Sequence, residues 1–170
     1  MQNQEQVAMK FFALLGLLIS MAVSMYLIYG PFTGLMNIGK PFQVKLIMGV
    51  TILVQLVSAI LVAVGFARLM ISIISRPSAA AATVVAIVSG GIAGGIAAGF
   101  SFGLTLGTMF AMAIPLKAIQ FQSGTINMWP WWKIFGTIFI KTSADGVIAG
   151  IPLGIGGTYI LSWILKRYKP

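Results

Sequence analysis

Lys141 and Asp145 are the residues best placed for charge chemistry. Asp145 is one of only two acids in the chain, and the other, Glu5, lies near the N-terminus. Side chains four apart share a helix face, so these two would be neighbours. They form either an intramembrane pair that lines a solute or proton path or a boundary pair, with Asp145 near a helix N-terminus. Thr142 and Ser143 are good capping residues and favour the boundary.

The residue types on which most catalytic sites depend are missing. The chain has no cysteine and no histidine. Thiolate and imidazole metal sites, His-ligated haem and Ser-His or Cys-His catalysis are therefore excluded. Two acids also leave too little for general acid-base catalysis. We predict a protein that is not an enzyme and has neither cofactor nor metal.

Composition identifies an integral membrane protein. Hydrophobic residues make up 59% of the 170 residues and charged residues 8%, whereas soluble proteins have about 25% charged residues. Several apolar runs reach the roughly 20 residues that a membrane-spanning helix needs. The first run, Phe11–Tyr29, is longer than a signal-peptide core and lacks a clear A-x-A cleavage site, so we expect a retained helix. The predicted fold is all-α, a polytopic helical bundle with one membrane domain over 1–170.

Small residues recur at every fourth position in the apolar runs. Such residues line up on one helix face and leave it nearly free of side chains. In lipid, this lets two helix backbones approach closely and gain dispersion contacts. The longest series is Gly91, Gly95, Gly99, Gly103 and Gly107. Shorter series are Gly16, Ser20 and Ser24; Ala59, Ala63 and Ala67; and Gly146, Gly150 and Gly154. We predict that the helices pack through these ridges; a sliding surface or a pore lined by backbone is the alternative.

The number of helices is open between four and six. The stretch Ala79–Leu116 has no charge over 38 residues. As one helix it would be about 57 Å long, beyond the hydrocarbon core of about 30 Å. Length favours a turn near Gly99–Gly103, whereas the unbroken glycine period favours continuity. We prefer four long helices, expected at Met9–Tyr29, at Val44–Ala67 with a pattern that continues to Ile74, at Ala79–Leu116 and at Ala144–Leu165.

The formal net charge of +9 suits a membrane surface better than nucleic acid. The basic residues mostly lie at the ends of apolar runs, where they meet anionic head groups and set orientation. With four spans and the N-terminus inside, Lys10, Arg68, Arg76, Lys166, Arg167 and Lys169 face the cytoplasm, and Lys40, Lys45, Lys117, Lys133 and Lys141 lie outside. We expect both termini on the cytoplasmic side of an inner-type membrane. Trp129, Trp131 and Trp132 are predicted interface anchors.

A loose family resemblance rests on two of these segments. The spacing of Gly16, Ser20 and Ser24 is similar to that on the first helix of the substrate-binding S components of energy-coupling factor vitamin transporters. The segment Ile140–Arg167 resembles their last helix in its polar start and basic finish. That family has six helices, and Ala79–Leu116 resists division into two. We therefore assign no site residue from the resemblance.

Two functional classes remain. The first is a membrane transport component, a solute-binding or pore-forming unit that takes a small molecule and works with partner subunits or as a homo-oligomer. The second is a non-catalytic structural or assembly subunit of a larger membrane complex. In both, the bilayer is a partner and nucleic acid is not.

Overall fold

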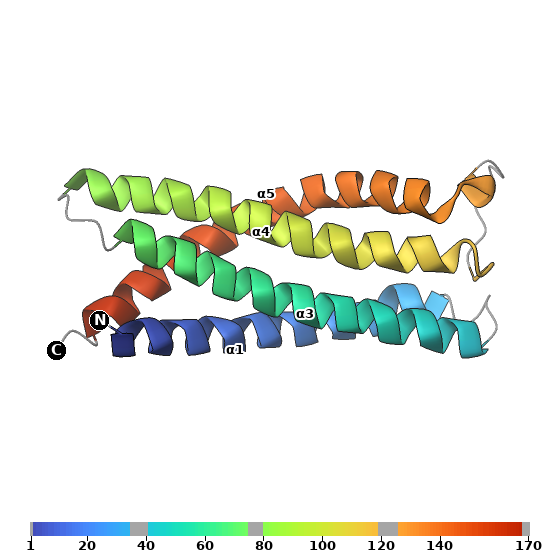
Figure 1. Cartoon of the computed structure of the whole chain (residues 1–170), viewed down its shortest axis with the longest axis horizontal. Coiled ribbons are helices and arrows are strands. Elements are labelled where there is room, and N and C mark those ends of the chain that lie inside the picture. The colour runs from blue at the N-terminus through green and yellow to red at the C-terminus, as the bar shows by residue number, and fades with distance from the viewer. Residues whose placement is uncertain (1, 35–40, 75–79, 119–125, 168–170) are drawn as a thin grey trace.

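The computed structural model describes residues 2–34, 41–74, 80–118 and 126–167. All regular secondary structure within these residues is helical. The long helices are α1 (Gln2–Leu27), α3 (Pro41–Ile74), α4 (Ala80–Ala113) and α5 (Trp131–Arg167). A π-helical turn, η1 (Ile28–Phe32), follows α1, and a short 3-10 turn, η2 (Ile126–Met128), precedes α5. Successive long helices run in opposite directions, and the chain starts and finishes at the same end of the bundle (Figure 1).

Four helices among the described residues are long and apolar enough to cross a membrane. The predicted all-α bundle is thereby confirmed, with four long helices rather than six among the described residues, and these helices fit an integral membrane protein. α4 passes through Gly99–Gly103 without a turn, so the glycine period marks one continuous helix. At 1.5 Å per residue its 34 residues extend about 51 Å. Its ends therefore reach past a hydrocarbon core of about 30 Å into the head-group layers. Lys40, Arg76 and Lys169 lie outside the described residues.

The start of the last helix corrects a sequence prediction. α5 begins at Trp131 rather than at Ala144, and the backbone N–H groups of Lys133 and Ile134 bond to the Pro130 carbonyl at its first turn. Thr142 is not a cap, because its hydroxyl donates to the Ile138 carbonyl at 2.7 Å within the helix. Lys141 resembles a boundary in sequence, but packing of the preceding turns on α4 carries the helix through it.

The Gly30-Pro31 pair also behaves differently from a turn that ends a helix. The chain stays helical through η1, with a π-helical turn where a stop was expected. Proline has no N–H to donate to the preceding turn. The Thr33 hydroxyl instead donates to the Ile28 carbonyl at 2.8 Å, and the Thr33 N–H bonds to the Gly30 carbonyl. Burial of Phe32 holds this turn against the bundle.

Two clusters of buried apolar side chains hold the bundle, one toward each end. The terminal cluster lies where the chain starts and finishes and draws on all four helices: Ala8, Phe12, Phe66, Ala67, Met70, Ile71, Ala86, Leu161 and Ile164. The distal cluster lies at the opposite end: Leu27, Phe32, Val44, Ile47, Met109, Ala113 and Ala118. α5 contributes no described residue to the distal cluster, so in its first half it packs mainly on α4.

The contact between α4 and α5 is made largely by glycine. A Cβ atom added to Gly99 would lie 2.6 Å from the Ser143 carbonyl oxygen, and one added to Gly146 would lie 2.8 Å from the Gly99 Cα. Side chains larger than hydrogen would therefore meet backbone, which cannot move aside. The two helices thus touch backbone to backbone, and in lipid the gain comes from dispersion between closely spaced atoms.

The close contact is wider than the predicted four-residue series. Gly90 and Gly94 also meet α5, and an added Cβ on either would overlap atoms of Thr158 or Gly154. Gly103 and Gly107 meet Phe139 and Phe135 near the distal end. The glycine pairs 90–91 and 94–95 therefore act together, because α5 crosses α4 obliquely and its line of contact shifts between neighbouring rows of residues.

α4 ends in a backbone cap that uses a residue with a positive φ angle. The Ala118 N–H bonds to the Ala113 carbonyl at 2.8 Å, and the Lys117 N–H bonds to the Ile114 carbonyl at 2.9 Å. These bonds form a Schellman motif, whose C′ residue adopts the left-handed conformation and is usually glycine. Here it is Lys117, with φ of 56°. A lysine in this conformation is strained relative to glycine.

We predict that Gly99→Leu destabilises the protein by about 3 kcal/mol or more, because the new side chain forces α4 away from α5. The matched control is Gly65→Leu on α3, where nothing lies within 4 Å of an added Cβ. That control should keep or slightly raise stability, since leucine favours helix over glycine by about 0.8 kcal/mol. Thermal unfolding of the purified variants measures both. Equal unfolding temperatures for the two variants would contradict the packing described above.

We predict that Lys117→Gly raises the free energy of unfolding by about 1 kcal/mol, because glycine adopts the positive φ without strain. Lys117→Ala is the matched control, since it removes the same charge but keeps the strain. Comparison of the two unfolding temperatures isolates the backbone effect. A glycine variant no more stable than the alanine variant would show that the cap is unstrained.

Candidate functional site

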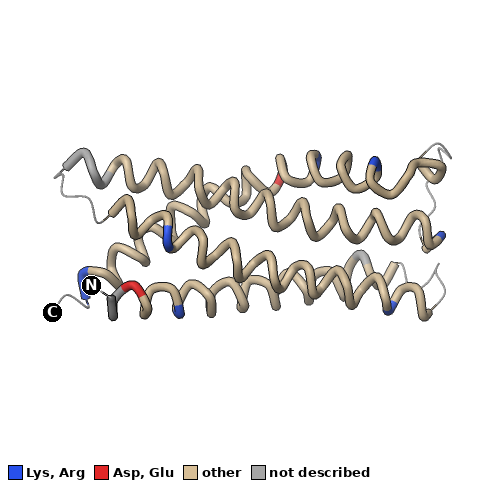
Figure 2. The backbone as a smooth tube through the Cα atoms, in the orientation of Figure 1, with Lys and Arg blue, Asp and Glu red and all other residues tan. Residues whose placement is uncertain are grey.

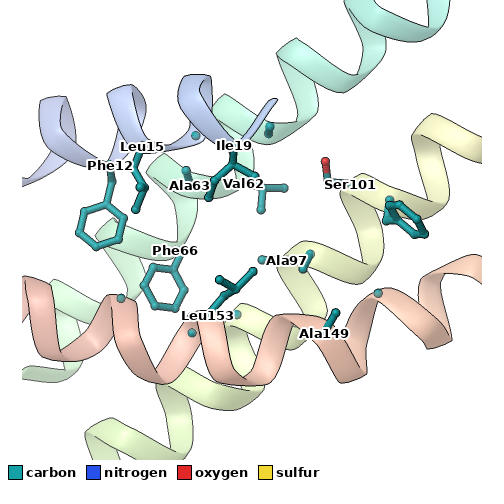
Figure 3. Close-up of a pocket in the computed structure, with 18 of the residues that line it drawn as sticks. Phe12, Leu15, Ile19, Val62, Ala63, Phe66, Ala97, Ser101, Ala149 and Leu153 are labelled. Carbon is teal, nitrogen blue, oxygen red and sulfur yellow. The ribbon is translucent and has the colours of Figure 1, made fainter. Parts of the chain in front are cut away.

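A partly open cavity of about 620 Å³ lies among the four long helices, and several of its α5 lining residues, Leu153 among them, are exposed. All four long helices line it, and Figure 3 shows side chains of α1, α3, α4 and α5 around one shared space. The lining is mostly apolar or small: Phe12, Leu15, Ile19, Val62, Ala63, Phe66, Ala97, Phe102, Ala149, Leu153 and Ile160 are among its members. Its size lies within the range of about 300–1,000 Å³ typical of sites for small organic molecules.

The cavity exists because α5 crosses the bundle. Figure 1 shows the first half of α5 beside α4, whereas the second half runs toward the start of α1. At that terminal end an added Cβ on Gly157 would lie 3.1 Å from the Phe66 ring and 3.5 Å from the Phe12 ring. The two rings pack at 5.7 Å between centroids. α5 therefore contacts α4 closely from Phe135 to Thr158 and packs on α1 and α3 near one end, and the space between remains open.

A belt of buried polar side chains lies beside the cavity. The Ser58 hydroxyl on α3 donates to the Gln55 carbonyl at 3.2 Å and lies 2.8 Å from the Ser101 hydroxyl on α4. The Thr105 hydroxyl is placed to donate to Gln55 Oε1 or to the Ser101 carbonyl. Gln55 and Ser101 line the cavity. These bonds join α3 to α4 and leave polar atoms at one side of an otherwise apolar space.

Three buried hydroxyl oxygens have no partner among the described residues, those of Ser20, Thr51 and Ser143, and the first two lie on α1 and α3. Ser20 on α1 and Thr51 on α3 are fully buried. Neither hydroxyl oxygen has a hydrogen-bond partner among the described residues. An unsatisfied buried hydroxyl is destabilising by about 1–3 kcal/mol. The buried hydroxyl groups of α1 and α3 therefore outnumber those that bond one helix to another.

Asp145 is the ionisable residue in the described cavity lining. It lies on the face of α5 that also presents Ala149, Leu153 and Ile160 to the cavity, one residue away from the glycine face that meets α4. Its side chain is exposed in the isolated chain. Figure 2 shows one acidic position at the terminal end and the other near the middle of the bundle.

The position of Asp145 along α5 differs from the one that the boundary hypothesis required. α5 has 37 residues and is about 55 Å long at 1.5 Å per residue. A hydrocarbon core of about 30 Å centred on this helix would place Asp145 roughly 9 Å inside the nearer boundary. The boundary hypothesis required Asp145 at a helix start, and α5 starts a long way before it. This part of the boundary hypothesis is wrong.

Lys141 and Asp145 lie on the same helix but do not form an ion pair. Among the described residues, no Lys or Arg nitrogen lies within 4.0 Å of a carboxylate oxygen. Lys141 is exposed and does not line the cavity, although it is one turn from Asp145. The structure therefore places the two residues one turn apart on α5 and gives only Asp145 a position at the cavity.

The tryptophans gather at the distal start of α5. Trp131 and Trp132 are exposed, and Lys133 Nζ lies 4.3 Å from the centroid of the Trp129 ring. At the other end of α5, Arg167 lies 4.9 Å from the Trp163 ring. Aromatic side chains paired with cations at both ends suit head-group layers, and their role as anchors stays a prediction.

Sequence reasoning did not find the cavity. Its walls are ordinary apolar residues from four helices, and nothing in their spacing distinguishes them from core. The one available clue was the polar spacing on α3, where Thr51, Gln55 and Ser58 share a face and are all buried.

No protein-family model, curated protein or solved structure matches this chain.

Proposed function

We propose that this membrane protein is a non-enzymatic transport component that binds a small solute in the cavity between its four helices. The observation that carries the proposal is the cavity of about 620 Å³, which combines apolar walls with Gln55, Ser101 and Asp145. Binding sites for small molecules are commonly apolar spaces with a few converging polar groups. An acid in the middle of a membrane-length helix is costly to keep there and usually marks a functional path.

A solute-binding unit fits this cavity better than an open pore. The terminal and distal clusters close the bundle on either side of the cavity with buried side chains such as Met70 and Met109. A water-filled pore would need polar groups through both clusters. The cavity opens sideways past exposed α5 residues such as Leu153, so passage of a solute to either end of the bundle requires the helices to move. We propose that partner subunits or further copies of the chain drive that movement, with both termini on the cytoplasmic side.

The proposal is tested by filling the cavity. Ala149→Trp places a large side chain into it, since Ala149 lines the cavity (Figure 3). Ile148→Trp is the matched control, because Ile148 is the adjacent, exposed residue outside the lining. The purified parent is first exposed to a panel of organic cations, organic anions and sugars in a thermal-unfolding assay. We expect at least one class to raise the unfolding temperature, as a ligand at 100 times its Kd stabilises by about 2.7 kcal/mol.

The two tryptophan variants should then differ in how the ligand changes their unfolding temperature. Ala149→Trp is expected to lose the ligand-induced rise, whereas Ile148→Trp is expected to keep it. If no class of solute raises the unfolding temperature of the parent, or if the parent is folded only with partner proteins, the transport proposal fails. The role of structural subunit would then account for the chain better.

A further inference from the structure

The charges around the cavity are distributed unevenly. The whole chain carries 11 Lys and Arg against 2 acids. None of the basic residues that the structure describes lines the cavity, yet one of the two acids, Asp145, does. The cavity is thus a local negative site in a strongly basic protein, and its carboxylate has no basic partner within 4.0 Å among the described residues.

The surroundings of that carboxylate exclude a simple metal site. Among the described residues no group of three or more His, Cys, Asp or Glu side chains is placed to hold a metal ion. Divalent cations in proteins take several carboxylate or carbonyl oxygens. A single acid beside apolar walls balances one positive charge and leaves the rest of its ligand to contact hydrocarbon.

Aromatic side chains are the second feature of the cavity lining that suits an organic cation. Phe12, Phe66 and Phe102 all line the cavity, and Figure 3 shows Phe12 and Phe66 on its terminal side. Ring faces attract organic cations within about 6 Å, and more strongly in the absence of water. Phe12 and Phe66 lie at Gly157, about 18 Å along α5 from Asp145, so their rings would contact the apolar groups of a ligand. Phe102 is the lining ring nearer to Asp145, because α4 meets α5 at Gly99 and Gly146. A ligand with a delocalised or alkylated positive centre and bulky apolar groups would use the carboxylate, these rings and the apolar walls.

We infer that the cavity binds a hydrophobic organic monocation, with Asp145 as its counter-ion. This inference rests on the proposed solute-binding function and names the substrate class of the same site. An anion would meet the Asp145 carboxylate without a basic residue to offset it, and a neutral solute would leave that carboxylate unpaired in a low-dielectric setting, where isolated charges are unfavourable. A cation is the solute that reduces this penalty on binding.

The test uses two probes of the same shape and opposite charge on the full chain. Tetraphenylphosphonium and tetraphenylborate are added separately to the purified protein in lipid nanodiscs, and binding is followed by equilibrium dialysis. Empty nanodiscs provide the correction for partition into lipid. The variants are Asp145→Asn, which keeps the size of the side chain, and Glu5→Gln, which makes the same change in net charge at the other acid, outside the cavity lining.

We expect saturable binding of the phosphonium to the parent and to Glu5→Gln, and binding weaker by at least about tenfold to Asp145→Asn, since removal of one member of a close charge pair between partners has effects of this size or larger. Asp145→Glu should retain most of the binding, because the charge remains. Tetraphenylborate should show no saturable binding. The comparison of the two probes on the parent needs no variant, so it tests the inference even if a substitution impairs folding.

Several results would overturn the inference, and they separate it from the proposed function. Equal phosphonium binding to the parent and Asp145→Asn, with loss in Ala149→Trp, would leave the cavity as a solute site but remove the counter-ion. Saturable binding that Ala149→Trp does not affect would contradict both proposals. Phospholipid that co-purifies with parent and Asp145→Asn alike, and that the phosphonium does not displace, would mark the cavity as a lipid site instead.

Discussion

The close approach of α4 and α5 is the constraint on which the rest of the structure depends. Inside a bilayer, apolar helices gain nothing by hiding from water, so their association rests on the distance at which their atoms can meet. Gly99, Gly146 and Gly154 remove the side chains that would hold the two backbones apart. With α5 fixed to α4 in this way, the remaining helices must close the bundle around an existing pair.

The cavity is a consequence of this arrangement. α5 cannot be both in backbone contact with α4 along its length and packed against α1 and α3 throughout. It meets them near the terminal end, where Gly157 admits the Phe66 ring, and it has no buried residue in the distal cluster. The space between the two regions is lined by all four helices. The same glycine contact that holds the protein together therefore determines where a solute could bind.

Much of the architecture could be predicted from the sequence, because the forces that produce it are local and periodic. Length, apolar content and the glycine period gave four long helices, and the small residues at Gly16 and Ala59 indeed lie where α1 meets α3. The helix ends were harder to predict. Lys141 and the Gly30-Pro31 pair look like boundaries in sequence, but packing keeps both segments helical. Tertiary contacts outweighed local preference at these positions.

The site was predictable only in part. Asp145 stood out because it is nearly alone as an acid, but its position at a cavity wall depends on the path of α5 through the bundle. Gly94 was outside the predicted series although it meets Gly154 directly, because a strict four-residue period ignores the oblique crossing of two helices. Cavity walls such as Ala97 and Leu153 carry no sequence pattern of their own, so only the assembled fold reveals them.

Disulfide trapping in the membrane tests the central claim most directly, because the chain has no cysteine of its own. An added Cβ on Gly91 would lie 3.3 Å from Cγ1 of Ile155, so Gly91→Cys with Ile155→Cys should form a disulfide within one chain on mild oxidation. The disulfide protects both thiols from a maleimide-polyethylene glycol reagent, so the oxidised protein keeps the mobility of the unlabelled monomer in gel electrophoresis. The control pair, Ile92→Cys with Ile155→Cys, starts from an exposed position on α4 and should stay reduced. Disulfides that link two chains at 91 and 155, or equal reaction of the control, would show that the glycine face of α4 meets something other than its own α5.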